Sequence, residues 1–167
     1  MERSRRTLAV GFALAAPAFV GLAVAETASK DLPAAEAQAF VEYIIQIHPY
    51  EEWPLWPGKD KLYKGTEPHG ALLTTYVNES ALGALKEKSG SLPAGSIIVK
   101  ENYTPAKELA AVTAMYRVEG YNPQAGDFFW IKFFPDGKVD AAGKVESCIA
   151  CHSSAPGEDF LFTGDVK

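Results

Sequence analysis

Two cysteines and a histidine near the C-terminal end carry the clearest chemical signal in this sequence. Residues 146–152 read ESCIACH, and Cys148 and Cys151 are the only cysteines among 167 residues. The spacing Cys-x-x-Cys-His is that of covalent c-type haem attachment. The two thiols add across the vinyl groups on one porphyrin edge, and the next imidazole then lies under the ring, within reach of the iron. We therefore expect one haem c per chain, attached through Cys148 and Cys151, with His152 as the proximal iron ligand.

Three other kinds of site use closely spaced cysteines. A thioredoxin-like redox couple opens a helix after a βαβ strand, but only 15 residues follow His152, which is too few for the rest of that fold. A disulfide across two intervening residues closes almost no loop and stabilises little. A zinc site needs four ligands, so His48 and His69 would have to join the two thiolates, which an exported chain rarely keeps free.

The N-terminal 25 residues predict export. MERSRR is cationic, TLAVGFALAAPAFVGLA is apolar, and residues 23–25 supply a small-x-small cleavage pattern typical of a signal peptide. A membrane span is the weaker interpretation, because the apolar run is short and ends in that pattern. We expect a signal peptide over residues 1–25 and a single haem domain over 26–167, in the periplasm or otherwise exported.

The charge balance excludes two classes of partner. Cleavage would remove three arginines and one glutamate from the 16 basic and 21 acidic residues, leaving 13 against 20 and a net charge of −7. An acidic chain without clustered lysine and arginine gives no footprint for nucleic acid or for anionic lipid. We expect no nucleic-acid partner and no membrane insertion after cleavage.

The sequence predicts an α+β fold, predominantly an antiparallel β-sheet, with an N-terminal helix and a short C-terminal haem-attachment helix. Apolar spacings of three and four predict the first helix over residues 34–48, ended by Pro49. Residues 50–70 are expected to form a loop packed by its tryptophans. We also expect a short helix over residues 79–88, capped by Asn78 or Ser80, and one helical turn over 106–111.

Four strands follow from β-branched and aromatic content. Their short connections favour antiparallel pairing. The aromatic residues of the fourth strand point to both of its faces, which predicts that it is covered on both sides. The strands are expected at residues 71–78, 95–103, 111–121 and 127–134.

The sixth coordination position of the iron has no obvious ligand in the sequence. No Met, His or Lys follows the haem motif except the terminal Lys167. Met115 is explained by core packing, and histidines such as His48 and His69 are more often structural than ligating. We expect a five-coordinate iron with an open or water-occupied distal face, which binds small molecules.

Four segments lie near the expected strands and haem motif: PHGALLTTYVN (68–78), PAGSIIVKE (93–101), DFFWIKFF (127–134), and CIACH with the trailing EDFLFT (158–163). Over about residues 60–162 the chain thereby resembles the cytochrome P-460 family, which includes the beta-type cytochromes c prime. The resemblance implies an antiparallel sheet that precedes the haem motif. It also implies either hydroxylamine oxidation, as in the cytochrome P-460 enzymes, or nitric oxide binding, as in the beta-type cytochromes c prime.

Lys100 is the residue that separates these two activities. In the cytochrome P-460 enzymes a lysine of this strand motif is bonded through its amine to a meso edge of the haem, and the matching position is Lys100. Period two places Lys100 on the face of Ile98, where a desolvated amine has a lowered pKa and becomes a nucleophile. The alternative is an exposed strand lysine beside Glu101.

Two further residues are candidates for roles near the haem. Glu146, two residues before Cys148, is the first candidate for a proton acceptor in hydroxylamine oxidation, ahead of Glu101; the alternative is a solvated surface glutamate. Arg117, the only arginine of the mature chain, is a candidate partner for haem propionates or a bound oxyanion. Its alternative is a pair with an acidic neighbour.

The sequence leaves three functions open. The first is an oxidoreductase for hydroxylamine or a related nitrogen oxide, which passes electrons to a redox partner protein. The second is a nitric oxide-binding cytochrome without turnover. The third is plain electron transfer, which requires Met115 or His69 as a second axial ligand. The family resemblance also implies a homodimer. The aromatic residues 53–63 are a candidate interface, and the alternative is a loop packed on the body of the same chain.

Overall fold

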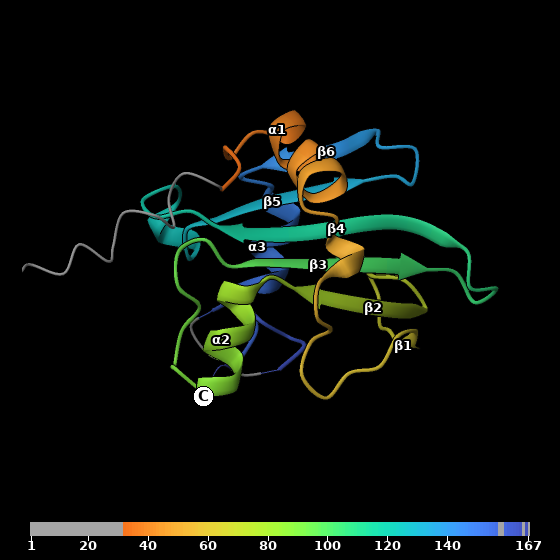
Figure 1. Ribbon diagram of the computed structural model, residues 1–167, viewed down its shortest axis with the longest axis horizontal. Coiled ribbons are helices and arrows are strands. Elements are labelled where there is room, and N and C mark those ends of the chain that lie inside the picture. The colour runs from red at the N-terminus through yellow and green to blue at the C-terminus, as the bar shows by residue number, and fades with distance from the viewer. Residues whose placement is uncertain (1–31, 157–158, 165, 167) are drawn as a thin grey trace, which may run out of the picture. The chain divides into compact units, whose positions relative to one another are not determined.

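A six-stranded antiparallel meander organises the chain (Figure 1). The computed structural model describes residues 32–156, 159–164 and 166. Each strand pairs with the next one along the chain. The strands are β1 (Tyr63–Lys64), β2 (Leu72–Val77), β3 (Ile97–Tyr103), β4 (Leu109–Arg117), β5 (Phe128–Phe133) and β6 (Val139–Gly143). The expected α+β class with a predominantly antiparallel sheet is confirmed.

Three α-helices accompany the sheet in the described residues. They are α1 (Ala37–Glu42), α2 (Glu79–Glu87) and α3 (Glu146–His152). A π-helical turn, Tyr43–Ile47, continues α1, and 3₁₀ turns occupy Tyr50–Glu52 and Pro123–Ala125. The side chain of Asn78 caps α2 by accepting a hydrogen bond from the Ala81 amide at 3.1 Å.

The chain divides into two units, residues 1–30 and 31–167. The expected signal peptide over residues 1–25 lies outside the described residues. No helix in the described part of the chain combines the length and the apolar character that a bilayer span requires.

The structure corrects three details of the expected elements. Strand β1 lies within the segment predicted to be a loop, and β6 was not predicted because its sequence, VDAAG, has little β-branched content. The helical turn expected over residues 106–111 is wrong. Thr104 donates its amide to the Glu108 carbonyl at 2.9 Å, and β4 begins at Leu109 opposite Tyr103. Strand pairing therefore outweighs the local helical propensity of this segment.

One face of the sheet packs against α1, which lies on the viewer's side in Figure 1. Phe40 and Ile44 are fully buried there. The Phe40 ring lies 5.6 Å from that of Phe129 and 5.7 Å from that of Tyr116. The strand residues of this face are Ile97, Val99, Val112, Ala114, Tyr116, Phe129, Ile131 and Phe133. The chain's own side chains therefore fill this side of the sheet.

The opposite face carries α3, which lies behind the sheet in Figure 1. Ile98, Met115 and Trp130 are cross-strand neighbours on this face, and all three are buried. Because Phe128 and Phe129 are also buried, strand β5 is covered on both sides, as its aromatic pattern predicts.

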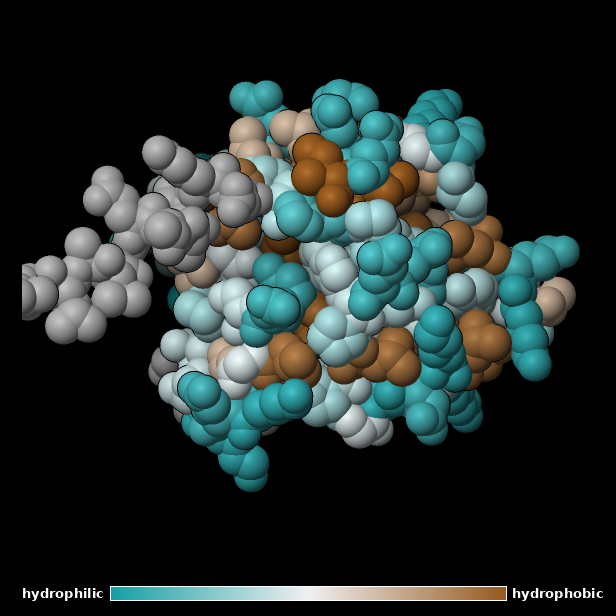
Figure 2. Space-filling model, viewed as in Figure 1, coloured by the Kyte–Doolittle hydropathy of each residue, from teal (hydrophilic) through white to brown (hydrophobic). Residues whose placement is uncertain are grey.

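The outer surface is mixed in character. In Figure 2, hydrophilic side chains surround smaller hydrophobic groups on the side that carries α1. Among the described residues, the large apolar side chains that remain exposed are Ile45, Ile47 and Phe162. Phe162 belongs to the C-terminal segment beside α3, where it lines the cavity described next.

Candidate haem site

A cavity of about 580 Å³ lies on the face of the sheet that carries α3. Strands β3, β4 and β5 contribute one wall, and α3, residues 68–70 and residues 161–163 contribute the others. The lining is mainly apolar. Cofactor pockets have this character and fall in the range of roughly 300–1,000 Å³.

The cavity receives the three residues of the Cys-x-x-Cys-His motif. Cys148, Cys151 and His152 all line it from α3, and both cysteines are free thiols. Burial raises the pKa of Cys148. Residues three apart on a helix share one side of it, so both thiols face the same space.

The alternatives to haem attachment lose support from this arrangement. The sheet is antiparallel throughout and has no βαβ unit, which a thioredoxin-like fold requires. Among the described residues, no group of three or more His, Cys, Asp or Glu side chains is placed to hold a metal ion. A zinc site built from the cysteines with His48 and His69 is therefore not formed.

His152 is held in the orientation that a metal ligand needs. Its Nδ1 lies 2.6 Å from the carbonyl oxygen of Phe160. A carbonyl oxygen only accepts, so Nδ1 carries the proton and Nε2 keeps its lone pair. The centre of its ring lies 4.7 Å from that of Trp130 and 5.4 Å from that of Phe162. Burial, assisted by the charge of Lys100, lowers the pKa of His152, which favours the neutral imidazole that binds metals.

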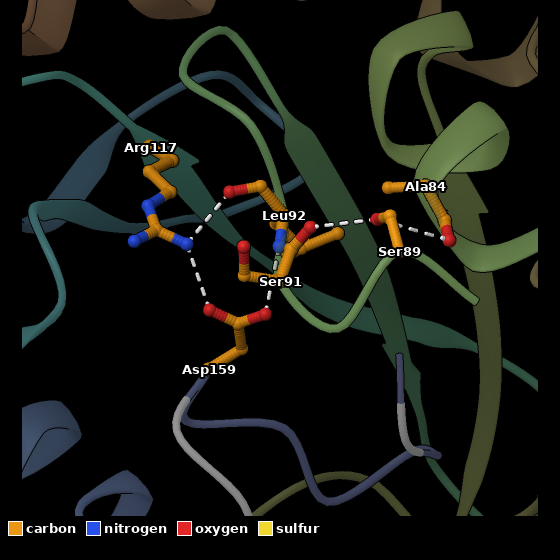
Figure 3. Close-up of polar contacts among 6 residues, drawn as sticks. All are labelled: Ala84, Ser89, Ser91, Leu92, Arg117 and Asp159. Atoms are coloured by element: carbon orange, nitrogen blue, oxygen red, sulfur yellow. Dashed lines mark hydrogen bonds and ion pairs between the residues drawn. The ribbon is translucent and has the colours of Figure 1, made fainter. Parts of the chain in front are cut away.

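Asp159, the residue before Phe160, takes part in a group of polar contacts with Arg117 and Leu92, called here the Asp159 clasp (Figure 3). Asp159 accepts a hydrogen bond from Arg117 Nη1 at 2.7 Å and another from the Leu92 amide at 2.7 Å. Arg117 Nη1 also donates to the Leu92 carbonyl at 2.6 Å. The clasp ties the segment that follows the haem motif to the end of β4.

Phe160 itself adopts an unusual backbone conformation. Its φ is +58°, which is uncommon for a residue with a side chain. Its ring packs beside Gly126, where an added Cβ would lie 2.9 Å from the ring. We infer that the ring contact and the Asp159 clasp together hold this conformation and thereby aim the carbonyl at His152.

Arg117 lies outside the cavity lining. The structure gives it an acidic partner, Asp159, although this partner comes from the C-terminal segment and not from a neighbouring strand. Its guanidinium also lies 5.7 Å from the centre of the Phe128 ring. The suggested contact with haem propionates or an oxyanion stays a prediction.

Lys100 lines the cavity from β3, on the same face as Ile98 and Asn102. This is the face that period two assigned to it. Burial, followed by the charge of Lys59, lowers the pKa of Lys100 from 10.5 to about 8. A substantial fraction of this amine is therefore neutral and nucleophilic near physiological pH.

The two glutamates considered as proton acceptors lie elsewhere. Glu146 is exposed in the first turn of α3 and is not part of the lining. Glu101 is buried on the α1 side of the sheet, where it accepts hydrogen bonds from Tyr50 at 3.2 Å and Tyr103 at 2.8 Å. The carboxylate that the structure brings to the cavity is Asp140, on the unpredicted strand β6.

His69, one of the two candidate sixth ligands, also lines the cavity. Its Nδ1 lies 2.9 Å from Asn102 Oδ1, and its ring centre lies 6.2 Å from that of His152. Burial, followed by the charge of Lys100, lowers the pKa of His69 to about 4. Met115, the other candidate sixth ligand, also lines the cavity but belongs to the buried cluster beside it.

A mainly apolar cavity of about 580 Å³, lined by a Cys-x-x-Cys-His helix, is the site of a haem-binding cytochrome of the c type. The family model described as Cytochrome P460 matches residues 48–163. Because this match covers more than half of the chain, the chain belongs to the cytochrome P460 family. A search of the curated proteins finds no match.

The Asp159 clasp predicts a large cost for its removal. Asp159→Ala should lower the free energy of unfolding by about 3 kcal/mol, because it leaves the half-buried Arg117 charge and the Leu92 amide without their partner. Asp140→Ala is the matched control: it breaks the Lys132–Asp140 pair, whose side chains are 41% and 43% exposed. That loss should be about 0–1 kcal/mol. Urea unfolding of both variants in the same haem-loaded state measures the difference, and equal costs would refute the clasp.

The lowered pKa of Lys100 predicts a pH dependence of stability before haem is bound. Between pH 8 and 10.5 the unfolded chain keeps a proton on Lys100 that the folded chain has released. The free energy of unfolding therefore gains a component that rises with pH across this window. Lys100→Met should remove that component. Urea unfolding of the haem-free chain at three pH values in the window tests this, and identical pH slopes for wild type and variant would contradict it.

Proposed function

We propose that the chain carries one covalently attached haem c, bonded through Cys148 and Cys151 and ligated by His152. We further propose that it acts as a haem-dependent oxidoreductase on small nitrogen oxides, with hydroxylamine as the first candidate substrate. One observation carries the proposal: the same mainly apolar cavity is lined by both thiols, by His152 and by Lys100. His152 has its Nε2 lone pair free to bind a metal. The Lys100 amine, which comes from the sheet, has a pKa of about 8.

The donor set suits a haem better than a bare metal ion. The two thiols and His152 come from one short helix, as attachment to one porphyrin edge requires. The rest of the lining is mainly apolar and supplies a dry surface for a flat macrocycle. The hydrogen bond from His152 to Phe160 fixes the ring and raises its basicity toward iron.

A haem held there would supply an iron that binds small nitrogen compounds and passes electrons singly to an acceptor. The chain's own residues have separate tasks around it. His152 would hold the iron through its Nε2, and the apolar walls would exclude bulk water. The neutral amine of Lys100 is the group that the family resemblance would bond to a meso edge of the macrocycle.

Proton removal is the remaining task in hydroxylamine oxidation, since electrons and protons leave the substrate together. Glu146 was the first candidate from the sequence, but it is solvent-exposed and outside the lining. We assign this task to Asp140, which lines the cavity and lies 2.8 Å from the Lys132 amine. Its partly exposed carboxylate can pass a proton to solvent.

The setting of the protein is part of the proposal. We place the mature chain in the periplasm or another exported location, because covalent attachment keeps the cofactor from being lost to a dilute exterior. A redox partner protein would take the electrons. We expect no nucleic-acid partner; a homodimer is the family-based expectation, and residues 53–63 are a candidate interface for it.

A second function follows if Lys100 is not bonded to the haem. The apolar lining favours small uncharged ligands, so the protein would then bind nitric oxide without turnover. This is the activity of the beta-type cytochromes c prime. The state of the Lys100 amine therefore separates the two functions, and a proteolytic peptide that ends at an unmodified Lys100 in haem-loaded protein identifies the second.

Hydroxylamine turnover tests the proposed enzyme. Haem-loaded wild type should reduce an artificial electron acceptor in the presence of hydroxylamine. Lys100→Met should keep its haem but react at least roughly tenfold more slowly. Without the bond from Lys100 to the macrocycle, the electronic properties of the cofactor differ. Lys138→Met, an exposed lysine in the β5–β6 turn, is the control and should match wild type. Haem-loaded wild type that binds nitric oxide tightly but shows no turnover contradicts the enzyme and supports the second function.

A further inference from the structure

Two of the three histidines in the chain line the cavity, His69 and His152. His152 ends α3, whereas His69 lies in the segment that precedes β2. Their ring centres are 6.2 Å apart, and their planes are nearly perpendicular at 89°. This spacing is too wide for a direct hydrogen bond between imidazoles, which brings ring centres to about 5 Å at ordinary donor–acceptor distances.

The side chain of Asn102 fixes the tautomer of His69. Asn102 Nδ2 donates to the carbonyl oxygens of Lys100 at 2.9 Å and Ala111 at 3.2 Å. Asn102 Oδ1 therefore faces the other way, toward the Gly70 amide at 3.4 Å and His69 Nδ1 at 2.9 Å. An amide oxygen only accepts. His69 Nδ1 consequently carries the proton, and His69 Nε2 keeps a lone pair.

The imidazoles of His69 and His152 thus have the same tautomer. Each ties its Nδ1 proton to an oxygen acceptor, Phe160 for His152 and Asn102 for His69. Each leaves Nε2 without a proton. A ring nitrogen held by a carbonyl oxygen is the usual second contact of a metal-ligating histidine.

The distance between the rings fits one metal ion between them. A metal–imidazole bond is about 2 Å long, and the ring centre lies about 1 Å beyond the bonded nitrogen. Two imidazoles on opposite sides of one iron therefore have centres about 6 Å apart, and the observed value is 6.2 Å. A distal histidine that only contacted an iron-bound ligand would have to lie about 2 Å farther away.

The segment that carries His69 is held firmly against the sheet. Asn102 is 5% exposed, and its amide group makes hydrogen bonds on both sides. Gly70 passes so close to β3 that a Cβ there would lie 2.6 Å from the Tyr103 carbonyl oxygen. Only glycine permits this approach. His69 is therefore placed by built contacts and not by a freely moving loop.

We propose that His69 is the sixth ligand of the haem iron, opposite His152. This inference rests on the proposed haem at Cys148, Cys151 and His152. It replaces the open distal face expected from the sequence with a face closed by a displaceable imidazole. An incoming ligand would take the coordination position of His69 Nε2, one bond to the metal replacing the other; no electron would move, and His69 would keep its Nδ1 proton.

This closure selects the ligands that reach the iron. Only small, strongly binding molecules compete with an imidazole already in place, and nitric oxide is of that kind. Because His69 must leave first, the observed rate of ligand binding reaches a ceiling set by its dissociation. A site open at rest would show a rate that rises in proportion to ligand concentration.

Spectra of the haem-loaded ferric protein test the assignment. Wild type should be low-spin by electron paramagnetic resonance, and His69→Ala should be high-spin. His69→Gly should return to low-spin when imidazole is added. His48→Ala is the matched control, because His48 is an exposed histidine outside the cavity lining, and its spectrum should equal that of wild type.

Two measurements on wild type remain decisive if the variants fail to load haem. Pulsed electron paramagnetic resonance of protein labelled with ¹⁵N-histidine should detect two ligating imidazoles. The rate of nitric oxide binding to the ferrous protein should saturate with concentration. In His69→Ala, where it can be measured, that rate should be at least roughly tenfold faster and linear.

The possible results separate this inference from the proposed function. A high-spin wild type overturns the role of His69, whether or not hydroxylamine turns over. A low-spin state that persists in His69→Ala also overturns it, because another group then ligates the iron. A low-spin, His69-dependent wild type without hydroxylamine turnover supports the inference and contradicts the proposed enzyme. Protein that binds no haem contradicts both.

Discussion

The sheet has two apolar faces, and the chain's own side chains fill one of them fully and the other only in part. On the α1 side, Phe40 and Ile44 close the layer against the strands. On the α3 side the strands leave a mainly apolar cavity of about 580 Å³. Protein interiors are close-packed, and large apolar voids cost stability. A ligand that fills this space therefore stabilises the folded chain by its own binding free energy, so that cofactor and fold depend on each other.

The C-terminal segment converts this cavity into a site with defined chemistry. Asp159 binds Arg117 and the Leu92 amide, and the next carbonyl, from Phe160, accepts the Nδ1 proton of His152. The orientation of the proximal imidazole thus depends on a contact with the far end of β4. On the opposite wall, Asn102 does the same for His69. In both cases an oxygen acceptor outside the motif fixes which ring nitrogen carries the proton, and the other nitrogen keeps its lone pair.

Local patterns in the sequence predicted the parts of this account that depend on neighbouring residues. The Cys-x-x-Cys-His spacing predicted a haem-binding protein of the c type, and period two placed Lys100 on the face of Ile98. The parts that failed depend on distant pairings. His69 meets Asn102, 33 residues away, and Arg117 meets Asp159, 42 residues away. Strand β6, which carries Asp140, forms because it pairs with β5, and its own sequence does not predict a strand.

The central claim is that Cys148 and Cys151 bond one haem to the cavity. The most direct measurement is the intact mass of the denatured protein after production together with a haem-attachment apparatus. If both cysteines carry the haem, the mass should be that of the mature chain plus one haem, and the haem should stay with the polypeptide in acidified organic solvent. The bare polypeptide mass, or a haem that the solvent removes completely, would contradict it.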